Sequence, residues 1–212
     1  MDYDNYEDNY IENSRKIPFV TVTILGINLL VYIVLEFIGS TLDSEFMVSC
    51  GALTSYKVIY EGEYHRLLTS FFLHFGPEHI FNNMLSLFLI GGETEKHIGH
   101  IKFAIIYFAA GLSSSIVSLI MHFIYEPYII SAGASGAIMG IGGALVVILL
   151  TNRVKIDKNR GIRFLIFLGL SILSGFTSST VDNAGHIGGL FAGLIIMLLF
   201  TLFSYIRKKL SH

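Results

Sequence analysis

The sequence is poor in charged residues, cysteine and proline. The low charge argues against a soluble domain, and the single cysteine excludes a disulfide within the chain. Charged residues make up 14% of the 212 residues, against about 25% in a soluble domain, so a soluble globular protein is disfavoured. Cys50 is the only cysteine, so no disulfide can form within the chain. There are three prolines, and no Ser/Pro-rich linker or repeat interrupts the sequence. We therefore expect one compact domain.

The sequence is rich in long apolar runs. Hydrophobic residues make up 53% of the chain, and a membrane-spanning helix needs roughly 20 mostly apolar residues. The sequence therefore predicts an all-α membrane protein built as a bundle of six transmembrane helices. The predicted spans are 18–38, 79–96, 101–122, 134–151, 162–180 and 184–206.

The distribution of positive charge predicts how these helices are oriented. Of the 14 Lys and Arg residues, all but Lys57 and Arg66 fall on one side of a six-helix topology. They are Arg15, Lys16, Lys96, Lys102, Arg153, Lys155, Lys158, Arg160, Arg163, Arg207, Lys208 and Lys209. By the positive-inside rule, we expect a cell-membrane protein with both termini in the cytoplasm. The expected parts are an acidic cytoplasmic tail (1–16), the membrane domain (17–206) and a basic cytoplasmic tail (207–212).

The connection 39–78 between the first two predicted helices is unusually long. A loop of roughly 40 residues is uncommon unless it is functional or has structure of its own. It mixes apolar and charged residues, which is typical of short amphipathic helices lying at the membrane interface. We therefore expect a structured loop on the external side.

Polar residues gather where three of the predicted helices begin. The second, fourth and sixth helices all start on the external side, with His79 and Asn83, then Ser135, then His186. Polar and ionisable groups inside a bilayer are rare and usually face a cavity or a partner. His79 and Asn83 are four residues apart and share one helix face. The topology thus predicts that all four side chains meet at one depth.

These residue types suit acyl transfer. A serine hydroxyl needs a base to remove its proton, and histidine is well matched to that task near neutral pH. The oxyanion that forms needs hydrogen-bond donors, which the Ser135 N–H, the Asn83 amide and the His79 ring can supply. Asp182 could touch the ring of His186, but we interpret it as a residue of the turn. The expected catalytic pair is therefore a Ser135–His186 dyad rather than a triad.

Small residues predict that the fourth and sixth helices pack closely. Gly133, Gly136 and Gly140 lie along the fourth helix, and Gly189 and Gly193 have GxxxG spacing on the sixth. Such faces let two backbones approach closely in lipid. Close packing would bring Ser135 within hydrogen-bonding reach of His186.

Four motifs in order along the chain resemble one family. The run 133–140 contains GxSG around Ser135, and 184–189 contains AGHIGG around His186. The pair His79 and Asn83 forms H-x-x-x-N, and the run 91–99 is glycine-rich at both ends. Together they are similar to the rhomboid intramembrane serine proteases over about residues 55 to 205. The resemblance implies a rhomboid-like six-helix bundle with a long external loop between helices 1 and 2.

The resemblance also implies an activity. A protein with these motifs is expected to be a serine-type endopeptidase that would cleave transmembrane-segment substrates near the external membrane surface. Ser135 would be the nucleophile, His186 the base, and His79, Asn83 and Ser135 the oxyanion donors. The implied partners are transmembrane protein substrates and the lipid bilayer, with no nucleic acid, metal or cofactor.

Two positions depart from the family pattern. The family's Trp-Arg pair in the first loop is His65-Arg66 here, and an aromatic residue four positions after the serine is replaced by Met139. We expect Arg66 to donate hydrogen bonds to carbonyl groups of the loop. A thioether can still contact the ring of His186, so we expect Met139 to alter tuning rather than abolish activity.

Three alternatives remain open from the sequence. A catalytically inactive rhomboid-like protein that binds membrane proteins would typically have lost Ser135 or His186, and both are present. A small transporter is less favoured, because no inverted repeat or broken helix pair is recognisable. A metal site on His65, His74 and His79 is disfavoured, because the sequence has no HExxH motif and no carboxylate placed beside them.

Overall fold

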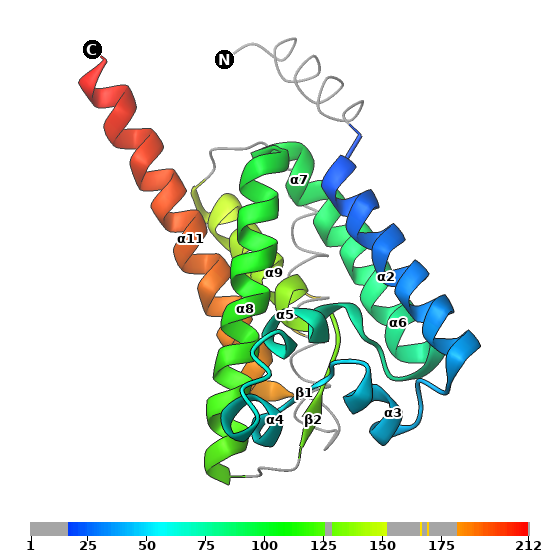
Figure 1. Ribbon diagram of the computed structural model, residues 1–212. Coiled ribbons are helices and arrows are strands. Elements are labelled where there is room, and N and C mark those ends of the chain that lie inside the picture. The colour runs from blue at the N-terminus through cyan, green and yellow to red at the C-terminus, as the bar shows by residue number, and fades with distance from the viewer. Residues whose placement is uncertain (1–16, 126–128, 152–165, 167–168, 170–181, 212) are drawn as a thin grey trace.

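The computed structural model describes residues 17–125, 129–151, 166, 169 and 182–211 (Figure 1). These residues are mostly helical. In chain order the elements are α2 (Phe19–Ile38), α3 (Ser44–Ser49), β1 (Leu53–Thr54), α4 (Ser55–Tyr60), α5 (Arg66–Thr69), η1 (Ser70–Phe72), α6 (Gly76–Ser86), η2 (Leu87–Gly91), α7 (Gly92–Ile98), α8 (His100–Tyr125), β2 (Ile130–Ser131), α9 (Ser135–Thr151) and α11 (Asn183–Leu210). The predicted tail 1–16 lies outside the described residues, as does nearly all of the predicted span 162–180.

Five of the predicted spans correspond to helices. Among the described residues, α2, α8 and α11 are long and apolar enough to cross a membrane, and α9 is a shorter apolar helix. The predicted span 79–96 is a continuous helical run of α6, the π-helical turn η2, and α7. Helix α11 continues to Leu210, so it includes the basic residues that we assigned to a separate tail. The count of six helices stays a prediction.

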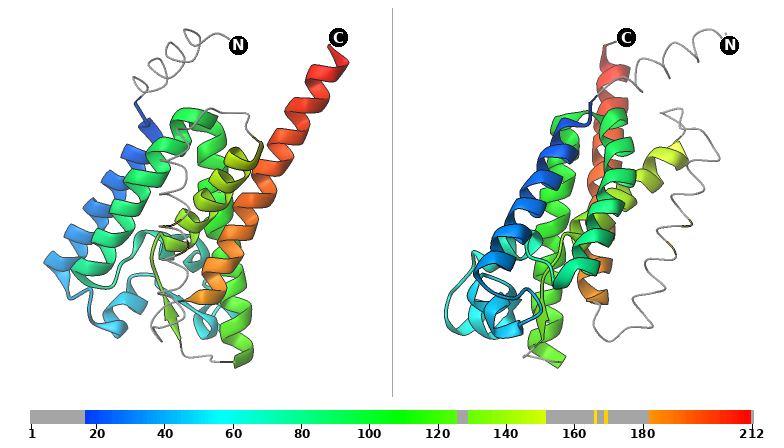
Figure 2. Two further views of the ribbon diagram at one scale, coloured as in Figure 1. Left: turned by 180° about the vertical axis from the view of Figure 1, so that it is seen from behind. Right: turned by 90° about the vertical axis from the view of Figure 1, so that its right-hand side faces the viewer.

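The positions of the helix ends show the direction in which the chain runs through the bundle. Helix α2 begins and α11 ends at the same end of the bundle, and the connection between α2 and α6 lies at the opposite end (Figure 2). Helix α9 runs between α6 and α11, and much of its surface is buried. This arrangement brings the first residues of α6, α9 and α11 toward the end that holds the long loop.

The connection between α2 and α6 contains the short helices that we predicted, α3, α4, α5 and η1. Arg66, only 4% exposed, donates from Nη1 to the carbonyls of Val48 at 2.6 Å and Ala52 at 2.8 Å. Its guanidinium also binds Glu63 and lowers the pKa of that carboxyl below its ordinary value. The expected role of Arg66 in bonding loop carbonyls is confirmed.

The loop also forms a small β-sheet that the all-α prediction missed. Leu53 pairs with Ser131, and Thr54 pairs with Ile130, in an antiparallel register. Strands of two residues carry no alternating pattern of their own, so the sequence gives little sign of them. The pairing ties the loop after α2 to the segment that leads into α9.

A buried carboxylate fixes the other end of α2. Glu95, 1% exposed, accepts hydrogen bonds from the backbone N–H groups of Val20 at 2.8 Å and Thr21 at 2.7 Å. It also accepts from the Thr21 hydroxyl and lies 2.5 Å from Nδ1 of His100. The first N–H groups of a helix have no partner within the helix, and a negative charge there is favoured. Glu95 thus joins α7 to the start of α2.

Glycine lets α9 and α11 approach until their backbones touch. A β-carbon at Gly189 would overlap the carbonyl group of Gly136, and one at Gly193 would overlap that of Gly140. At Gly143 the Leu190 carbonyl occupies the same kind of position. The predicted close packing of these two helices is confirmed, and side chains larger than hydrogen do not fit there.

We therefore expect Gly193→Ala to destabilise the protein. The added methyl group must push α11 away from α9, which costs about 1–3 kcal/mol of the free energy of unfolding for overpacking. The measurement is thermal unfolding in detergent. Gly26→Ala on α2 is the matched control, because no atom lies within 4 Å of a β-carbon there. Equal melting temperatures for the two variants would contradict the close packing.

Candidate active site

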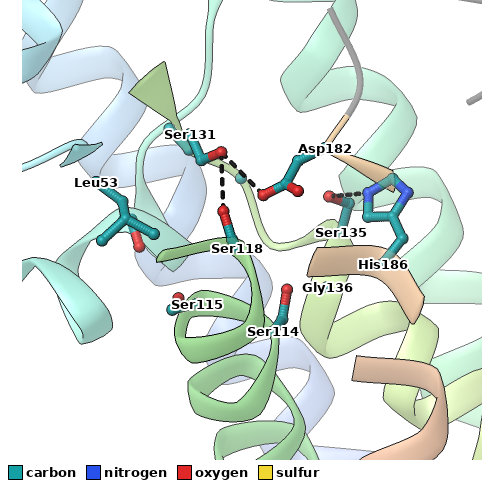
Figure 3. Close-up of a pocket in the computed structure, with 12 residues that line it drawn as sticks. Leu53, Ser114, Ser115, Ser118, Ser131, Ser135, Gly136, Asp182 and His186 are labelled. Carbon is teal, nitrogen blue, oxygen red and sulfur yellow. Dashed lines mark hydrogen bonds between the residues drawn. The ribbon is translucent and has the colours of Figure 1, made fainter. Parts of the chain in front are cut away.

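The hydroxyl of Ser135 and the imidazole of His186 lie side by side. Nε2 of His186 is 2.7 Å from Oγ of Ser135, a hydrogen-bonding distance, although 51 residues separate them in the sequence (Figure 3). Ser135 is the first residue of α9, and His186 lies in the first turn of α11. The contact between α9 and α11 therefore brings an imidazole nitrogen within hydrogen-bonding distance of a serine hydroxyl.

The segment before Ser135 is fixed from two sides. The N–H of Gly133 donates to the carbonyl of Ser70 at 2.9 Å, and the N–H of Ala134 donates to Nε2 of His74 at 3.3 Å. Gly133 has φ of +126°, a conformation that residues with a side chain rarely adopt. His74 is buried, so protein atoms enclose the ring that supports this segment.

His79 directs a hydrogen-bond donor toward the same place. Its Nδ1 accepts from the N–H of Phe75 at 3.3 Å, so in the neutral ring the hydrogen is on Nε2. A β-carbon at Gly133 would lie 2.8 Å from this Nε2 and 3.8 Å from Oγ of Ser135. The space that Gly133 leaves open therefore adjoins both the nucleophile and a ring N–H, as an oxyanion hole requires.

Asn83 lies one turn further along α6 and is nearly buried. Its Nδ2 donates to the carbonyl of His79 at 2.9 Å, and its Oδ1 has no hydrogen-bond partner among the described residues. The described residues show no hydrogen bond between Asn83 and either Ser135 or His186. The amide nevertheless keeps a second hydrogen that it can donate. Asn83 therefore supplies a potential donor beside His79.

The carboxylate of Asp182 makes no hydrogen bond to the imidazole of His186 in the described part of the chain. Its carboxylate accepts from the N–H of Gly185 at 2.9 Å and from the hydroxyl of Ser131 at 2.9 Å. Nδ1 of His186 has no hydrogen-bond partner among the residues described. We interpreted Asp182 as a residue of the turn, and it is the last residue before α11, which it caps. The catalytic dyad stays a prediction.

A small polar cavity opens beside Ser135. Its volume is about 40 Å³, and its lining includes Ser114, Ser118, Ser131 and Asp182 (Figure 3). The sequence analysis missed the three serines and treated Asp182 only as a residue of the turn. Ser114 and Ser118 are four residues apart and face the same way on α8, but the apolar run around them hides that spacing. A cavity of this size and polarity can hold a few water molecules or a small side chain.

The two residues that depart from the family pattern, Met139 and His65, differ in burial. Met139 is buried in α9, one turn after Ser135. His65 directly precedes α5, and its side chain is well exposed.

The rings of His74 and His79 lie edge to face with centroids 5.2 Å apart. In the described part of the chain, no three His, Cys, Asp or Glu residues are grouped to hold a metal ion.

The sequence of the chain is similar to known proteins. Residues 61–203 match the Rhomboid domain family. The chain is 38% identical over 176 residues to "Rhomboid protease GluP" of Bacillus subtilis (strain 168), covering 83% of this chain and 34% of that protein. It is 38% identical over 155 residues to "RHOMBOID-like protein 2" of Arabidopsis thaliana, covering 73% and 48%. It is 32% identical over 209 residues to "Rhomboid protease AarA" of Providencia stuartii, covering 86% and 73%.

The chain spans only about a third to a half of the length of the first two of these relatives. Their names describe whole proteins that are longer than the matched part. The similarity therefore concerns the membrane domain and the residues within it.

The space that Gly133 leaves open predicts that a side chain at this position would impair the reactivity of Ser135. Gly133→Ala should lower labelling of Ser135 by a fluorophosphonate at least tenfold, because the methyl group would occupy the space beside His79 Nε2 and strain the backbone. The measurement is the rate of covalent labelling of the folded protein. Gly62→Ala is the matched control: Gly62 also has positive φ, +73°, but nothing lies within 4 Å of its added β-carbon. Similar labelling rates for both variants would count against an oxyanion hole at Gly133.

Proposed function

The chain belongs to the rhomboid family of intramembrane proteases, and from that membership we propose that it is an active serine endopeptidase using Ser135 and His186. Its homology to rhomboid serine proteases and its apolar helices make it a multi-pass membrane protein. The proposed substrates are membrane proteins, cleaved in or near a transmembrane segment. The observation that carries the proposal is the 2.7 Å contact between Nε2 of His186 and Oγ of Ser135.

The first half of the proposed reaction forms an acyl-enzyme. Nε2 of His186 takes the proton of the Ser135 hydroxyl as Oγ attacks the carbonyl carbon of the scissile bond. The oxyanion that develops receives hydrogen bonds from the Ser135 N–H, from Nε2–H of His79 and from the Asn83 amide. His186 then returns its proton to the leaving amine, and the acyl group stays on Oγ.

The second half needs water, which the bilayer itself does not supply. The polar cavity beside Ser135 gives water molecules hydrogen-bonding partners at the nucleophile. His186 removes a proton from a water molecule as the water oxygen attacks the acyl carbon. His186 then returns that proton to Oγ of Ser135, which leaves the acyl carbon. Ser135, His186 and the donors suffice for this route, so the proposal includes no metal or cofactor.

We propose the six-helix topology with both termini in the cytoplasm, the residues 162–180 forming the remaining span. Two observations support this topology. Helix α2 begins and α11 ends at the same end of the bundle (Figure 1), and the last turn of α11 is basic. The dyad then lies toward the external side, where the substrate would be cut near the membrane surface.

An inactive rhomboid-like binding protein is the second candidate. The presence of both Ser135 and His186, already within hydrogen-bonding distance, disfavours it. A transporter requires no activated serine, so reactivity of Ser135 distinguishes both alternatives from a protease.

The first test is therefore covalent labelling by a fluorophosphonate together with cleavage of a transmembrane reporter. We expect both in the wild type and neither in Ser135→Ala or His186→Ala, because each loses one half of the dyad. Ser113→Ala on α8 is the control, since that hydroxyl contacts the Gly188 carbonyl and does not line the cavity. Labelling that persists in Ser135→Ala would exclude Ser135 as the nucleophile.

A second test concerns Asn83. Asn83→Ala should lower kcat by roughly 10- to 1,000-fold, the usual range for losing one oxyanion donor, with little change in melting temperature. Asn28→Ala is the matched control, because Asn28 is also a buried amide that donates to the carbonyl four residues earlier, Ile24 at 2.8 Å. An unchanged kcat for Asn83→Ala would remove Asn83 from the oxyanion site.

A further inference from the structure

Helix α2 ends beside the start of α6, and a buried threonine joins the two (Figures 1 and 2). Thr41 follows shortly after α2 and is fully buried. Its Oγ1 accepts a hydrogen bond from the N–H of Gly76 at 3.1 Å, and its hydroxyl donates to Oε1 of Glu36 on α2. The N–H of Thr41 donates to the same carboxylate oxygen at 3.2 Å. A polar chain therefore runs from α2 to the first residue of α6.

The start of α6 depends on such a partner. Its N-cap, Phe75, has no polar side chain to cap the helix, and Pro77 has no N–H. The first N–H groups of a helix have no acceptor within it, so Gly76 must find one elsewhere. Gly76 has φ of +75°, and a β-carbon there would lie 2.7 Å from Cδ2 of Leu42. The turn that opens α6 is thus fitted against Thr41 and the residue after it.

The same turn holds the ring of His79. The N–H of Phe75, next to that of Gly76, donates to Nδ1 of His79 at 3.3 Å, which is long for a hydrogen bond. This bond places the ring hydrogen on Nε2, the atom beside the space at Gly133. If the Phe75 N–H moved away, the hydrogen could shift to Nδ1, and Nε2 would then be an acceptor. An oxyanion would lose a donor without any change in His79 itself.

Glu36 sets the direction of the Thr41 hydroxyl. A hydroxyl group has one hydrogen to donate and two lone pairs that accept. Because Glu36 takes the hydrogen, the lone pairs of Oγ1 stay directed to the N–H of Gly76. A hydrogen bond to a charged acceptor is also stronger than one between neutral groups. The carboxylate therefore orients the group that supports the turn.

We propose that Thr41, oriented by Glu36, is a positioning residue for the oxyanion donor: it holds the Phe75–Gly76 turn so that His79 keeps its hydrogen on Nε2. This inference rests on the proposed protease function. Neither Thr41 nor Glu36 is placed to touch the reacting atoms, so their effect reaches the transition state through His79.

The first test is Thr41→Val, which keeps the size of the side chain and removes its hydroxyl. We expect kcat for a transmembrane reporter to fall about tenfold with KM unchanged, because an oxyanion donor acts in the transition state. Thr41→Ser restores the hydroxyl and should restore most of kcat. Glu36→Leu should lower kcat in the same direction, whereas Glu36→Gln keeps an acceptor and should retain most of it. An unchanged kcat in Glu36→Leu would overturn the orienting role of Glu36.

Thr21→Val is the matched control. Thr21 is also fully buried, and its hydroxyl donates to a carboxylate, that of Glu95 at 2.6 Å, but at the opposite end of α2. We expect both valine variants to melt at a lower temperature and only Thr41→Val to lose kcat. Equal losses of kcat in the two variants would assign Thr41 a general structural role and overturn the proposal.

A second test separates action through His79 from any other route. In a His79→Ala background, Thr41→Val should lower kcat further by less than about twofold, because the group that it positions is gone. An undiminished tenfold loss there would overturn the proposal. NMR of the ¹⁵N-labelled His79 ring in Ser135→Ala protein gives a reading that needs no folded His79→Ala. We expect the Nε2–H form, and the Nδ1–H form should appear on adding Thr41→Val; the same form in both would also overturn the proposal.

The outcomes also distinguish this proposal from the protease function. Cleavage that depends on Ser135, with a wild-type kcat in Thr41→Val, overturns the positioning role and leaves the protease intact. Absence of any Ser135-dependent cleavage or labelling overturns the protease function and, with it, this inference.

Discussion

The backbones of α9 and α11 are in contact, and the geometry of the candidate site depends on that contact. Gly136 and Gly140 present carbonyl groups where Gly189 and Gly193 would otherwise have side chains. In lipid, such proximity is stabilised by packing rather than by the hydrophobic effect, so small residues determine it. A wider separation of the two helices would move the imidazole of His186 away from the hydroxyl of Ser135. The same glycine face therefore determines both the packing of the two helices and the geometry of the candidate site.

Two further attachments fix the parts of the site that lie outside these helices. Arg66 bonds the carbonyls of Val48 and Ala52 and so shapes the loop after α2. That loop is joined through β1 to β2, and β2 leads directly into Gly133 and α9. The loop thus supports the segment before the nucleophile. Glu95 acts at the opposite end of the bundle, where it binds the start of α2 and keeps that helix against α7.

The sequence predicts the parts of this structure that depend on long periodic or compositional signals. The apolar runs identify α2, α8, α9 and α11, and the positions of Ser135 and His186 at the starts of two of them lead to the 2.7 Å contact that is found. The β-pair and the bond between Ser131 and Asp182 depend instead on single contacts between distant segments, for which a sequence has no pattern. The capping role of Asp182 had a local signal, since aspartate directly before an apolar helix is a common N-cap.

Ser135 is the first residue of α9, and the residues after it in this helix are mostly buried. The serine therefore lies at the end of the bundle that holds the long loop, where α6 and α11 also begin (Figure 2). Peptide groups of an intact transmembrane α-helix are already hydrogen-bonded along their own axis and shielded by side chains. Under the proposed protease function, a transmembrane segment reaching this serine would have to unravel locally before cleavage, so the energetic cost of fraying would select which chains are processed.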